Sequence, residues 1–324
     1  MQQCRQENGQ AMQETAVGET GAGPGPAALG GPGERCGFLV LDKPAGLSSH
    51  ACVAQVRRAY GLKRVGHGGT LDPAVTGVLP IALGPATRLL PYLSGDKAYR
   101  GVIQLGLTTT SDDLEGEPLQ RHPVPDLGST ELDAALAPFR GAILQRPPQV
   151  SAVHVNGERA YARVRRGEQL ELAARPVTIH ALELLTWEPA SGRLELAVRC
   201  SAGTYIRSLA RDLGEALGCG GCLASLRRTE ALGFSLEQAL PLEQLQQQPP
   251  ALINPLTPLA ALPQHRLGEA ELAGWRCGRI QTTPECLDAG SPVVVVGPDG
   301  NLAGMASALG DGQLQPRLVL QASG

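Results

Sequence analysis

The sequence lacks the features that mark several large classes of protein. In 324 residues it has no apolar run of 18 or more, so no membrane-spanning helix is expected. The N-terminus lacks the basic-then-apolar order of a secretory signal peptide. Eight cysteines without dense spacing do not make a disulfide scaffold, and a reduced cytoplasmic compartment is the simplest interpretation. Aromatic residues are only 3% of the chain, so each tyrosine near basic residues is of interest as a platform on which a base stacks.

Acidic residues are scarce in one segment. Residues 43–100 carry eight basic side chains and only two acids, Asp72 and Asp96, which gives a net charge of +6. The whole chain carries −3. A basic segment in an acidic protein indicates a surface that binds a polyanion, although a solvated charged face is an equally good explanation of the charge alone.

Composition divides the chain into three parts. Residues 1–35 are rich in Gly, Gln, Glu and Ala, which predicts a disordered tail. Residues 36–250 mix predicted strands and helices and form the main domain. A stretch rich in Gln, Pro and Leu, residues 243–263, predicts a linker, and residues 251–324 comprise the end of it and a small, mostly β unit.

Local patterns predict the elements that carry the candidate residues. A helix begins after Ser48 or Ser49 and ends at Gly61, and residues 63–77 form a glycine-rich loop. A second helix follows Gly203, because apolar residues recur every four positions from Tyr205. Buried or half-buried strands are predicted over 37–42, 78–83, 99–107, 193–200 and 223–232.

The loop Gly66-His-Gly-Gly-Thr-Leu-Asp-Pro73 presents a carboxylate within the basic segment. Pro73 pushes the backbone of Asp72 to an extended conformation, and the glycines permit close approach of another chain. An ordinary turn aspartate is the simpler explanation of a lone Asp-Pro. A phosphate cradle is a weaker alternative, because the Lys-Ser/Thr ending of a P-loop is missing.

Two further clusters could bind phosphate or carboxylate. In Cys200-Ser-Ala-Gly-Thr-Tyr-Ile-Arg207, a helix N-terminus and an arginine make a positive pocket, although helix packing and a surface arginine also explain them. Four arginines between positions 159 and 166 flank Tyr161, which indicates either a phosphate-contacting edge or a solvated charged helix. Cys219-Gly-Gly-Cys222 is a lone Cys-x-x-Cys, and without a second pair of ligands no metal site is expected.

Six motifs, in order, resemble those of the TruB-type tRNA pseudouridine-55 synthases. Residues 66–80 resemble the catalytic motif of that family, and the resemblance covers residues 37–324. Departures are small, at Gly68, Val150 and His154. The motifs are Leu41-Asp-Lys-Pro-Ala-Gly-Leu-Ser-Ser49, Gly66-His-Gly-Gly-Thr-Leu-Asp-Pro-Ala-Val-Thr-Gly-Val-Leu-Pro80, Asp96-Lys-Ala-Tyr-Arg100, Gln145-Arg-Pro-Pro148, Ser201-Ala-Gly-Thr-Tyr-Ile-Arg207 and Leu226-Arg-Arg228.

The resemblance implies a fold and an activity. The fold is α+β, with a mixed, largely antiparallel central sheet flanked by helices and a small PUA-like β domain at the C-terminus that binds RNA. The activity is isomerisation of uridine 55 in the T-arm of tRNA to pseudouridine. The N1–C1′ bond breaks, the uracil turns, and C5 joins C1′, with no redox change and no cofactor. The base must leave the helical stack, because a carboxylate cannot reach C1′ inside it.

The resemblance also implies roles for individual residues. Asp72 is the catalytic carboxylate, acting on C1′ or on a ribose proton, and Arg207 holds it ionised and oriented. Tyr99 stacks on the target base, Tyr205 and Leu226 line the pocket, and Lys43 with Pro44 supports the site. His67 fills the space that the flipped nucleotide leaves. The basic residues expected to contact the tRNA are Arg57, Arg58, Lys63 and Arg64.

Two other functions use the same motifs or the same surface. A non-catalytic tRNA-binding protein would have no reason to place Asp72 among phosphates, so the carboxylate favours the enzyme. An RNA-guided pseudouridine synthase also carries these motifs, but the short C-terminal unit and the lack of basic extensions argue against it. We therefore expect a cytoplasmic monomer that acts on tRNA, with no membrane, metal or protein partner.

Overall fold

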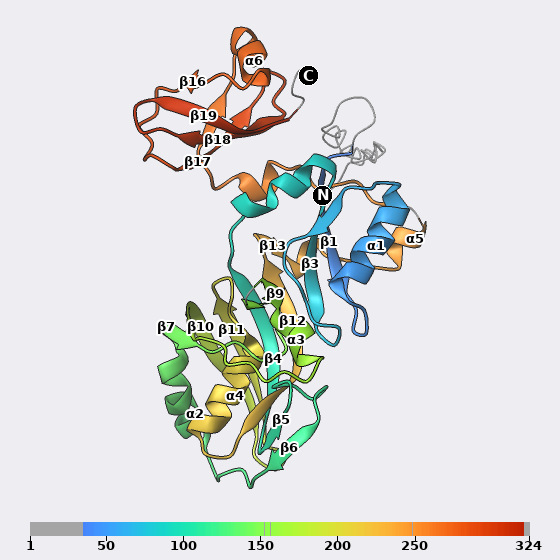
Figure 1. The fold of residues 1–324 in the computed structure, drawn as a ribbon, viewed down its shortest axis with the longest axis vertical. Coiled ribbons are helices and arrows are strands. Elements are labelled where there is room, and N and C mark those ends of the chain that lie inside the picture. The colour runs from blue at the N-terminus through green and yellow to red at the C-terminus, as the bar shows by residue number, and fades with distance from the viewer. Residues whose placement is uncertain (1–34, 152, 156, 248, 321–324) are drawn as a thin grey trace, which may run out of the picture.

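The computed structural model describes residues 35–320, except residues 152, 156 and 248. The predicted disordered tail over 1–35 lies outside the described residues, apart from Arg35. Two sheets organise the described chain, one of ten strands in the main body and one of five strands at the other end of the long axis (Figure 1). None of the described helices has the length and apolar character needed to cross a bilayer.

The ten-stranded sheet is mixed and largely antiparallel, as predicted. Its order is β14-β1-β3-β12-β4-β11-β10-β7, with β13 added to β12 and β2 added to β3. Only the β1–β14 and β3–β12 pairs are parallel among the described strands of this sheet. The strands are β1 (Gly37–Lys43), β2 (Val65–His67), β3 (Thr76–Leu83), β4 (Lys97–Leu105), β7 (Gly141–Gln145), β10 (Arg175–Glu188), β11 (Arg193–Cys200), β12 (Gly221–Ala231), β13 (Phe234–Ser235) and β14 (Leu240–Pro241).

Helices cover the two halves of this sheet separately. α1 (Ser49–Tyr60) packs on β1 and β3, and it begins and ends as predicted. The Ser48 side chain accepts from the amide of Ala51 at 3.1 Å, and Gly61 ends the helix at φ 64°. On the other half, α2 (Ser129–Leu136) and α4 (Ile206–Ala216) bury their apolar faces against β4, β10 and β11. The two cores meet at Leu226, which packs against both.

Two sequence predictions need correction in detail. The glycine-rich loop over 63–77 contains β2, because Val65 and His67 pair with β3. The strand predicted over 99–107 begins at Lys97 and is divided at Gly106, whose φ of 81° breaks the ladder. Beyond the break lies a small sheet, β5 (Leu107–Thr109) with β6 (Pro118–Arg121).

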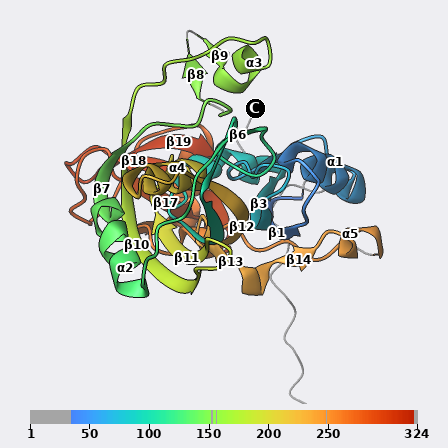
Figure 2. The same cartoon turned by 90° about the horizontal axis from the view of Figure 1, so that it is seen from below.

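The described residues between positions 150 and 170 form an excursion away from the main sheet (Figure 2). It contains a short strand pair, β8 (His154–Val155) and β9 (Glu158–Arg159), followed by α3 (Ala160–Val164). In the view of Figure 2 this excursion projects at the top, on the side of β6 and α1.

The C-terminal unit is the small, mostly β structure that the sequence predicts. Its sheet has the order β15-β17-β18-β19-β16. Trp275 of α6 (Glu269–Arg276) is fully buried against it, and its indole donates to the carbonyl of Ala303 at 3.0 Å. The strands are β15 (Gln264–Arg266), β16 (Gln281–Thr282), β17 (Pro292–Val296), β18 (Leu302–Ala308) and β19 (Gln313–Val319).

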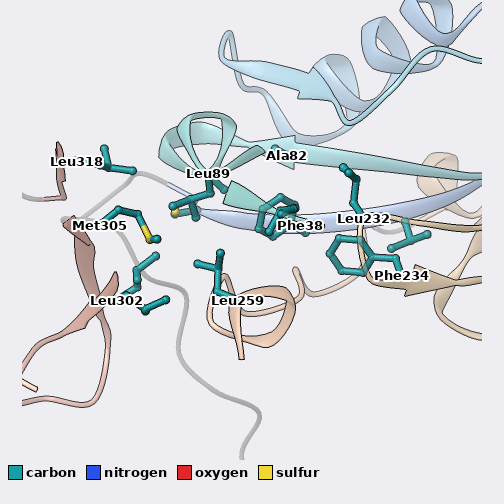
Figure 3. Packing of buried hydrophobic residues seen from close by; sticks show 14 of the residues in the cluster. Phe38, Ala82, Leu89, Leu232, Phe234, Leu259, Leu302, Met305 and Leu318 are labelled. Atoms are coloured by element: carbon teal, nitrogen blue, oxygen red, sulfur yellow. The ribbon is translucent and has the colours of Figure 1, made fainter. Parts of the chain in front are cut away.

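The predicted linker over 243–263 is packed against the main domain. It contains α5 (Gln244–Gln247), and Ile253 exchanges two backbone hydrogen bonds with Phe38, of 2.9 and 2.7 Å. Leu259 then joins a buried cluster that runs from Phe38 in β1 to Met305 in β18 (Figure 3). The C-terminal sheet therefore shares an apolar core with the first half of the main sheet.

Candidate active site

Asp72 and Arg207 form an ion pair although they lie far apart in the sequence. Oδ2 of Asp72 is 2.9 Å from Nη2 of Arg207. The side chain of Arg207 is 8% exposed and that of Asp72 is 48% exposed. The carboxylate therefore faces open space, with the guanidinium buried behind it.

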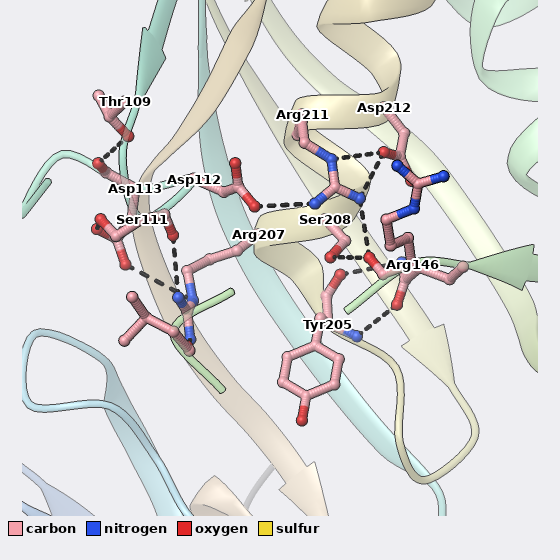
Figure 4. A network of polar contacts seen from close by, with 12 residues as sticks. Thr109, Ser111, Asp112, Asp113, Arg146, Tyr205, Arg207, Ser208, Arg211 and Asp212 are labelled. Carbon is pink, nitrogen blue, oxygen red and sulfur yellow. Dashed lines mark hydrogen bonds and ion pairs between the residues drawn. The ribbon is translucent and has the colours of Figure 1, made fainter. Parts of the chain in front are cut away.

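The protein holds the Arg207 guanidinium from several sides (Figure 4). Nη1 donates to the carbonyl of Ser111 at 2.9 Å, and Nη2 donates to the carbonyl of Val150 at 3.0 Å. Nε lies 3.6 Å from Oδ2 of Asp113, a carboxylate that is largely buried. The acidic loop 112–117, to which the sequence patterns assign no function, supplies the second acid beside Arg207.

Buried side chains from two elements hold the loop that carries Asp72. Lys43, at the end of β1, is fully buried and donates to the carbonyls of Pro44, Leu47 and Pro73 at 2.8, 2.7 and 3.0 Å. Burial lowers the pKa of Lys43, and nearby Asp72 opposes this shift. The hydroxyl of Ser49 in α1 donates to the carbonyl of Leu71 at 3.1 Å and accepts from its amide at 2.9 Å. Both residues adjacent to Asp72 are thus fixed.

Arg228 holds the same loop from the sheet. It is fully buried, and its Nε donates to the carbonyl of Val78 at 2.7 Å. Nη2 and Nη1 donate to the carbonyls of Gly69 and Thr70 at 3.1 and 3.5 Å. Arg228 is a supporting residue that was not among the expected site residues, although its place in the Leu226-Arg-Arg228 motif is a signal in the sequence.

A pocket of about 610 Å³ lies in front of the ion pair. Three of the residues expected there, Tyr99, Tyr205 and Leu226, line it together with Asp72 and Arg207. Polar side chains from α1, the Asp72 loop, β4 and the excursion at 150–170 also line the pocket, together with several apolar residues. The complete set of these other lining residues is Ser48, Ser49, His50, Thr70, Leu71, Pro73, Val75, Lys97, Val150, Ser151, Arg165, Gly203, Thr204, Ile206 and Leu223.

The two pocket tyrosines are fixed differently. Tyr99 projects from β4 and is almost fully buried, and burial raises its pKa while the adjacent Arg228 opposes the shift. Tyr205 is half-buried at the N-cap of α4, and burial raises its pKa too. The Gln145 amide holds the Tyr205 backbone, accepting from its N–H at 2.8 Å and donating to its carbonyl at 3.1 Å. Through this contact, Gln145 of the Gln-Arg-Pro-Pro motif helps to position Tyr205 in the pocket.

His67 and the basic residues expected to bind RNA lie outside the pocket lining. The ring of His67 packs edge-on against His50 with centroids 5.2 Å apart, and burial lowers its pKa. Arg57 donates to the carbonyl of Val65 at 3.0 Å. Arg58, Lys63 and Arg64 are exposed at the end of α1 and in the turn after it.

The other candidate clusters are less suited to ligand binding. Arg163 and Arg166 pair with Glu168, and Arg166 also pairs with Glu158, which favours a solvated charged helix for these two. The side chains of Arg159 and Tyr161 lie outside the described residues. Cys219 and Cys222 are buried free thiols, and no group of three potential metal ligands occurs in the described part of the chain.

The chain is similar in sequence to one family over most of its length. The family model "TruB family pseudouridylate synthase (N terminal domain)" matches residues 57–206, and the model "tRNA pseudouridylate synthase B C-terminal domain" matches residues 207–255. A protein from Parasynechococcus marenigrum (strain WH8102), named tRNA pseudouridine synthase B, is 65% identical and covers 89% of this chain and 98% of its own. A protein of the same name from Synechococcus sp. (strain WH7803) is 62% identical with the same coverage.

A solved structure agrees with this assignment. A chain from a Cbf5-Nop10-Gar1 complex superposes with a TM-score of 0.67 at 25% identity, and the match covers 90% of each chain. Together with the two family models and the relatives, these similarities show that this chain belongs to the TruB family of pseudouridylate synthases.

Proposed function

We propose that this protein converts uridine 55 in the T-arm of tRNA to pseudouridine. The observation that carries the proposal is the Asp72–Arg207 pair, in which a half-exposed carboxylate borders a pocket of about 610 Å³. A protein that only binds tRNA gains nothing from a carboxylate that faces a polyanion, because the two repel. The names of the relatives, tRNA pseudouridine synthase B, support tRNA as the substrate.

The chemistry begins when the target nucleotide leaves the stack and enters the pocket. Asp72 then acts in its ionised form, either by attacking C1′ or by removing the C2′ proton. Arg207 fixes the direction of the carboxylate, because its own nitrogens are held by the carbonyls of Ser111 and Val150. The reaction moves no electrons to or from an outside acceptor, so the proposal includes no cofactor.

The remaining residues bind and shape the substrate. Tyr99 stacks on the uracil from the sheet, and Tyr205 and Leu226 form the walls around it. His67 occupies the space that the flipped nucleotide leaves in the RNA. Arg57, Arg58, Lys63 and Arg64 contact phosphates along the T-arm, and the β unit within 251–324 extends the RNA-binding surface.

The enzyme acts as a cytoplasmic monomer without a protein partner in this proposal. The main alternative within the class is an RNA-guided synthase, since a Cbf5 chain that resembles this fold comes from an archaeal box H/ACA sRNP complex. Relatives that are more than 60% identical and are named tRNA pseudouridine synthase B favour the stand-alone enzyme.

The test uses unmodified tRNA with tritium at C5 of uridine. The wild-type protein alone should release the label from position 55, and Asp72→Asn should release none above about one per cent of wild type, since a lost nucleophile or base removes several kcal/mol of barrier lowering. Filter binding on the same preparations should show that Asp72→Asn still binds tRNA. Release that requires an added guide RNA would support the alternative, and loss of binding with activity would make Asp72 a structural residue.

A further inference from the structure

Lys97 is a charged residue of the pocket whose ammonium has no partner among the residues that the structure describes. Asp72 and Arg207, also in the lining, pair with each other. The Lys97 ammonium makes no hydrogen bond or ion pair with any residue that the structure describes. A half-buried ammonium without an acceptor is costly, because desolvation is not compensated. Such a cost is typical of groups that find their partner only in the substrate or the transition state.

The position of Lys97 places its ammonium on the floor of the pocket. It is the first residue of β4, two positions before Tyr99, so both side chains project from the same face of the strand. Its Nζ also lies near the Asp72 loop, since a methyl group built on Gly69 would be 3.9 Å from it. The same methyl group would be 3.5 Å from Nη1 of Arg228. Lys97 and Arg228 therefore lie close together beneath this loop.

Two like charges at this position keep the floor of the pocket electropositive. Burial, and secondarily Arg228, lower the pKa of Lys97. No carboxylate lies within ion-pair distance of either cation among the described residues. An anion that arose beside Tyr99 would find an unneutralised positive charge already in place.

The proposed reaction produces such an anion. If Asp72 attacks C1′, its oxygen forms a bond to C1′ while the N1–C1′ electron pair departs on N1. If Asp72 removes the C2′ proton instead, the C2′–H pair forms a C1′–C2′ double bond and the N1–C1′ pair again departs on N1. In both cases one negative charge moves from the Asp72 carboxylate to the uracil, away from Arg207.

We propose that Lys97 is a catalytic residue whose ammonium stabilises the negative charge of the departing uracil, a role that rests on the proposed isomerase function. A phosphate of the flipped nucleotide is the other anion that Lys97 could meet. The half-buried position beside Tyr99 favours the base, because phosphates remain at the mouth of a pocket that takes in a nucleobase. Arg228 reinforces the field but is occupied by the carbonyls of Gly69, Thr70 and Val78.

The first experiment compares charge and size at position 97. Lys97→Met keeps the apolar stem without charge, Lys97→Gln keeps a polar end without charge, and Lys97→Arg keeps the charge. The matched control is Arg100→Met, because Arg100 lies on the opposite face of β4, is 58% exposed and pairs with Glu195 at 3.2 Å. Single-turnover isomerisation at saturating enzyme, the Kd for tRNA and the melting temperature are measured for each.

We expect the two neutral variants to lose about 100-fold in the single-turnover rate, the size typical for one lost donor to a developing anion. Their Kd for tRNA should stay within about threefold of wild type, and Lys97→Arg should recover most of the rate. Arg100→Met should match wild type in rate. A wild-type rate in Lys97→Gln, or a loss confined to Kd with a shallower salt dependence, would overturn the proposal and would indicate phosphate contact in the second case.

The second experiment changes the leaving group. Fluorine at C5 makes the uracil anion more stable, so a substrate with 5-fluorouridine at position 55 needs less help from Lys97. The rate deficit of Lys97→Met relative to wild type, followed by nuclease digestion and mass spectrometry of the rearranged nucleoside, should be clearly smaller on this substrate. An equal deficit on both substrates would contradict a charge-stabilising role. If the wild-type protein isomerises neither substrate, the proposed function itself fails, which is a separate outcome.

Discussion

The ion pair at the centre of the site joins a half-exposed anion to a buried cation. Burying a guanidinium is costly unless its nitrogens find acceptors, and Arg207 finds them in two carbonyls and two carboxylates. Since these acceptors come from different segments of the chain, the guanidinium cannot turn without losing several contacts. The direction of the Asp72 carboxylate is therefore set by residues that never touch the substrate.

Replacing Arg207 by lysine tests whether the site needs the planar guanidinium group, with its several hydrogen-bond donors, or only a positive charge. The charge remains, but one ammonium cannot satisfy Asp72, Ser111 and Val150 together. We expect Arg207→Lys to lose most of its turnover, about 100-fold, while its Kd for tRNA stays near wild type. Tritium release and filter binding provide the two measurements.

The control for this change lies one turn further along α4. The guanidinium of Arg211 also forms ion pairs with two carboxylates, those of Asp112 and Asp212, but Arg211 does not line the pocket. Arg211→Lys should lower the melting temperature slightly and leave turnover near wild type. Equal loss in both variants would mean that Arg207 acts through the stability of α4 and not through Asp72.

Two adjacent serines have different roles: Ser49 supports the Asp72 loop and Ser48 caps α1, so the two effects can be measured separately. Ser49→Ala leaves the amide and carbonyl of Leu71 without their partner in a buried position, which should cost about 1–3 kcal/mol of unfolding free energy and lower turnover. Ser48→Ala removes an N-cap and should cost about 1 kcal/mol while leaving turnover nearly unchanged. Urea unfolding and tritium release distinguish the two, and equal turnover in both variants would contradict the supporting role of Ser49.

At the scale of elements, the site depends on the parallel contact between β3 and β12. This contact brings Gly77 opposite Arg228, so that the Arg228 side chain can reach back under the Asp72 loop. A Cβ at Gly77 would lie 2.1 Å from the carbonyl oxygen of Arg228, and φ there is 102°. Only glycine permits this approach.

Gly77→Ala should therefore be strongly destabilising. Overlap with a backbone oxygen adds to the strain of positive φ, and we expect a loss of about 3 kcal/mol or more in unfolding free energy. Gly46→Ala is the matched control, because Gly46 also has positive φ, 86°, but a Cβ there would meet nothing within 4 Å. It should lose only about 1–2 kcal/mol. Comparable losses by denaturant unfolding would show that strain alone, and not the β3–β12 approach, decides the effect.

At the scale of the whole molecule, charge and packing are distributed unevenly. The exposed basic residues Arg58, Lys63 and Arg64 lie together in the last turn of α1 and just after it, whereas Arg121 lies in β6 at the far end of the main body (Figure 1). If the first group contacts tRNA phosphates, each change to alanine should make the slope of log K against log salt shallower by about one. Arg121→Ala should leave the slope unchanged. Unchanged slopes for all four variants would place the RNA on another surface.

Because the two sheets share an apolar core, we expect removal of the C-terminal unit to destabilise the main domain. Truncation after residue 257 would remove Leu259, Met305 and Leu318 from the buried cluster that they share with Phe38. We expect a melting temperature lower by several degrees in the truncated protein, measured by circular dichroism. Unchanged stability would mean that the cluster of Figure 3 contributes little to the main domain.

The sequence by itself determined the local elements and the identity of the site. Ser48, Gly61 and the spacing of apolar residues specified α1, because caps and periodicity are properties of neighbouring residues. The ordered motifs predicted the family and named Asp72, Arg207, Tyr99, Tyr205 and Leu226, and the structure brings these five to one pocket.

Only the tertiary structure showed which other residues surround and support these five site residues. Asp113, Ser49 and Arg228 reach the site from three distant segments, and their partners are backbone groups or side chains that no spacing along the chain reveals. The same is true of Lys97, because only the positions of its neighbours in space show that its ammonium has no partner among the described residues. Packing of residues 243–263 on β1 was also invisible in their composition, because a segment rich in Gln and Pro is read as a linker unless the apolar surface it covers is known.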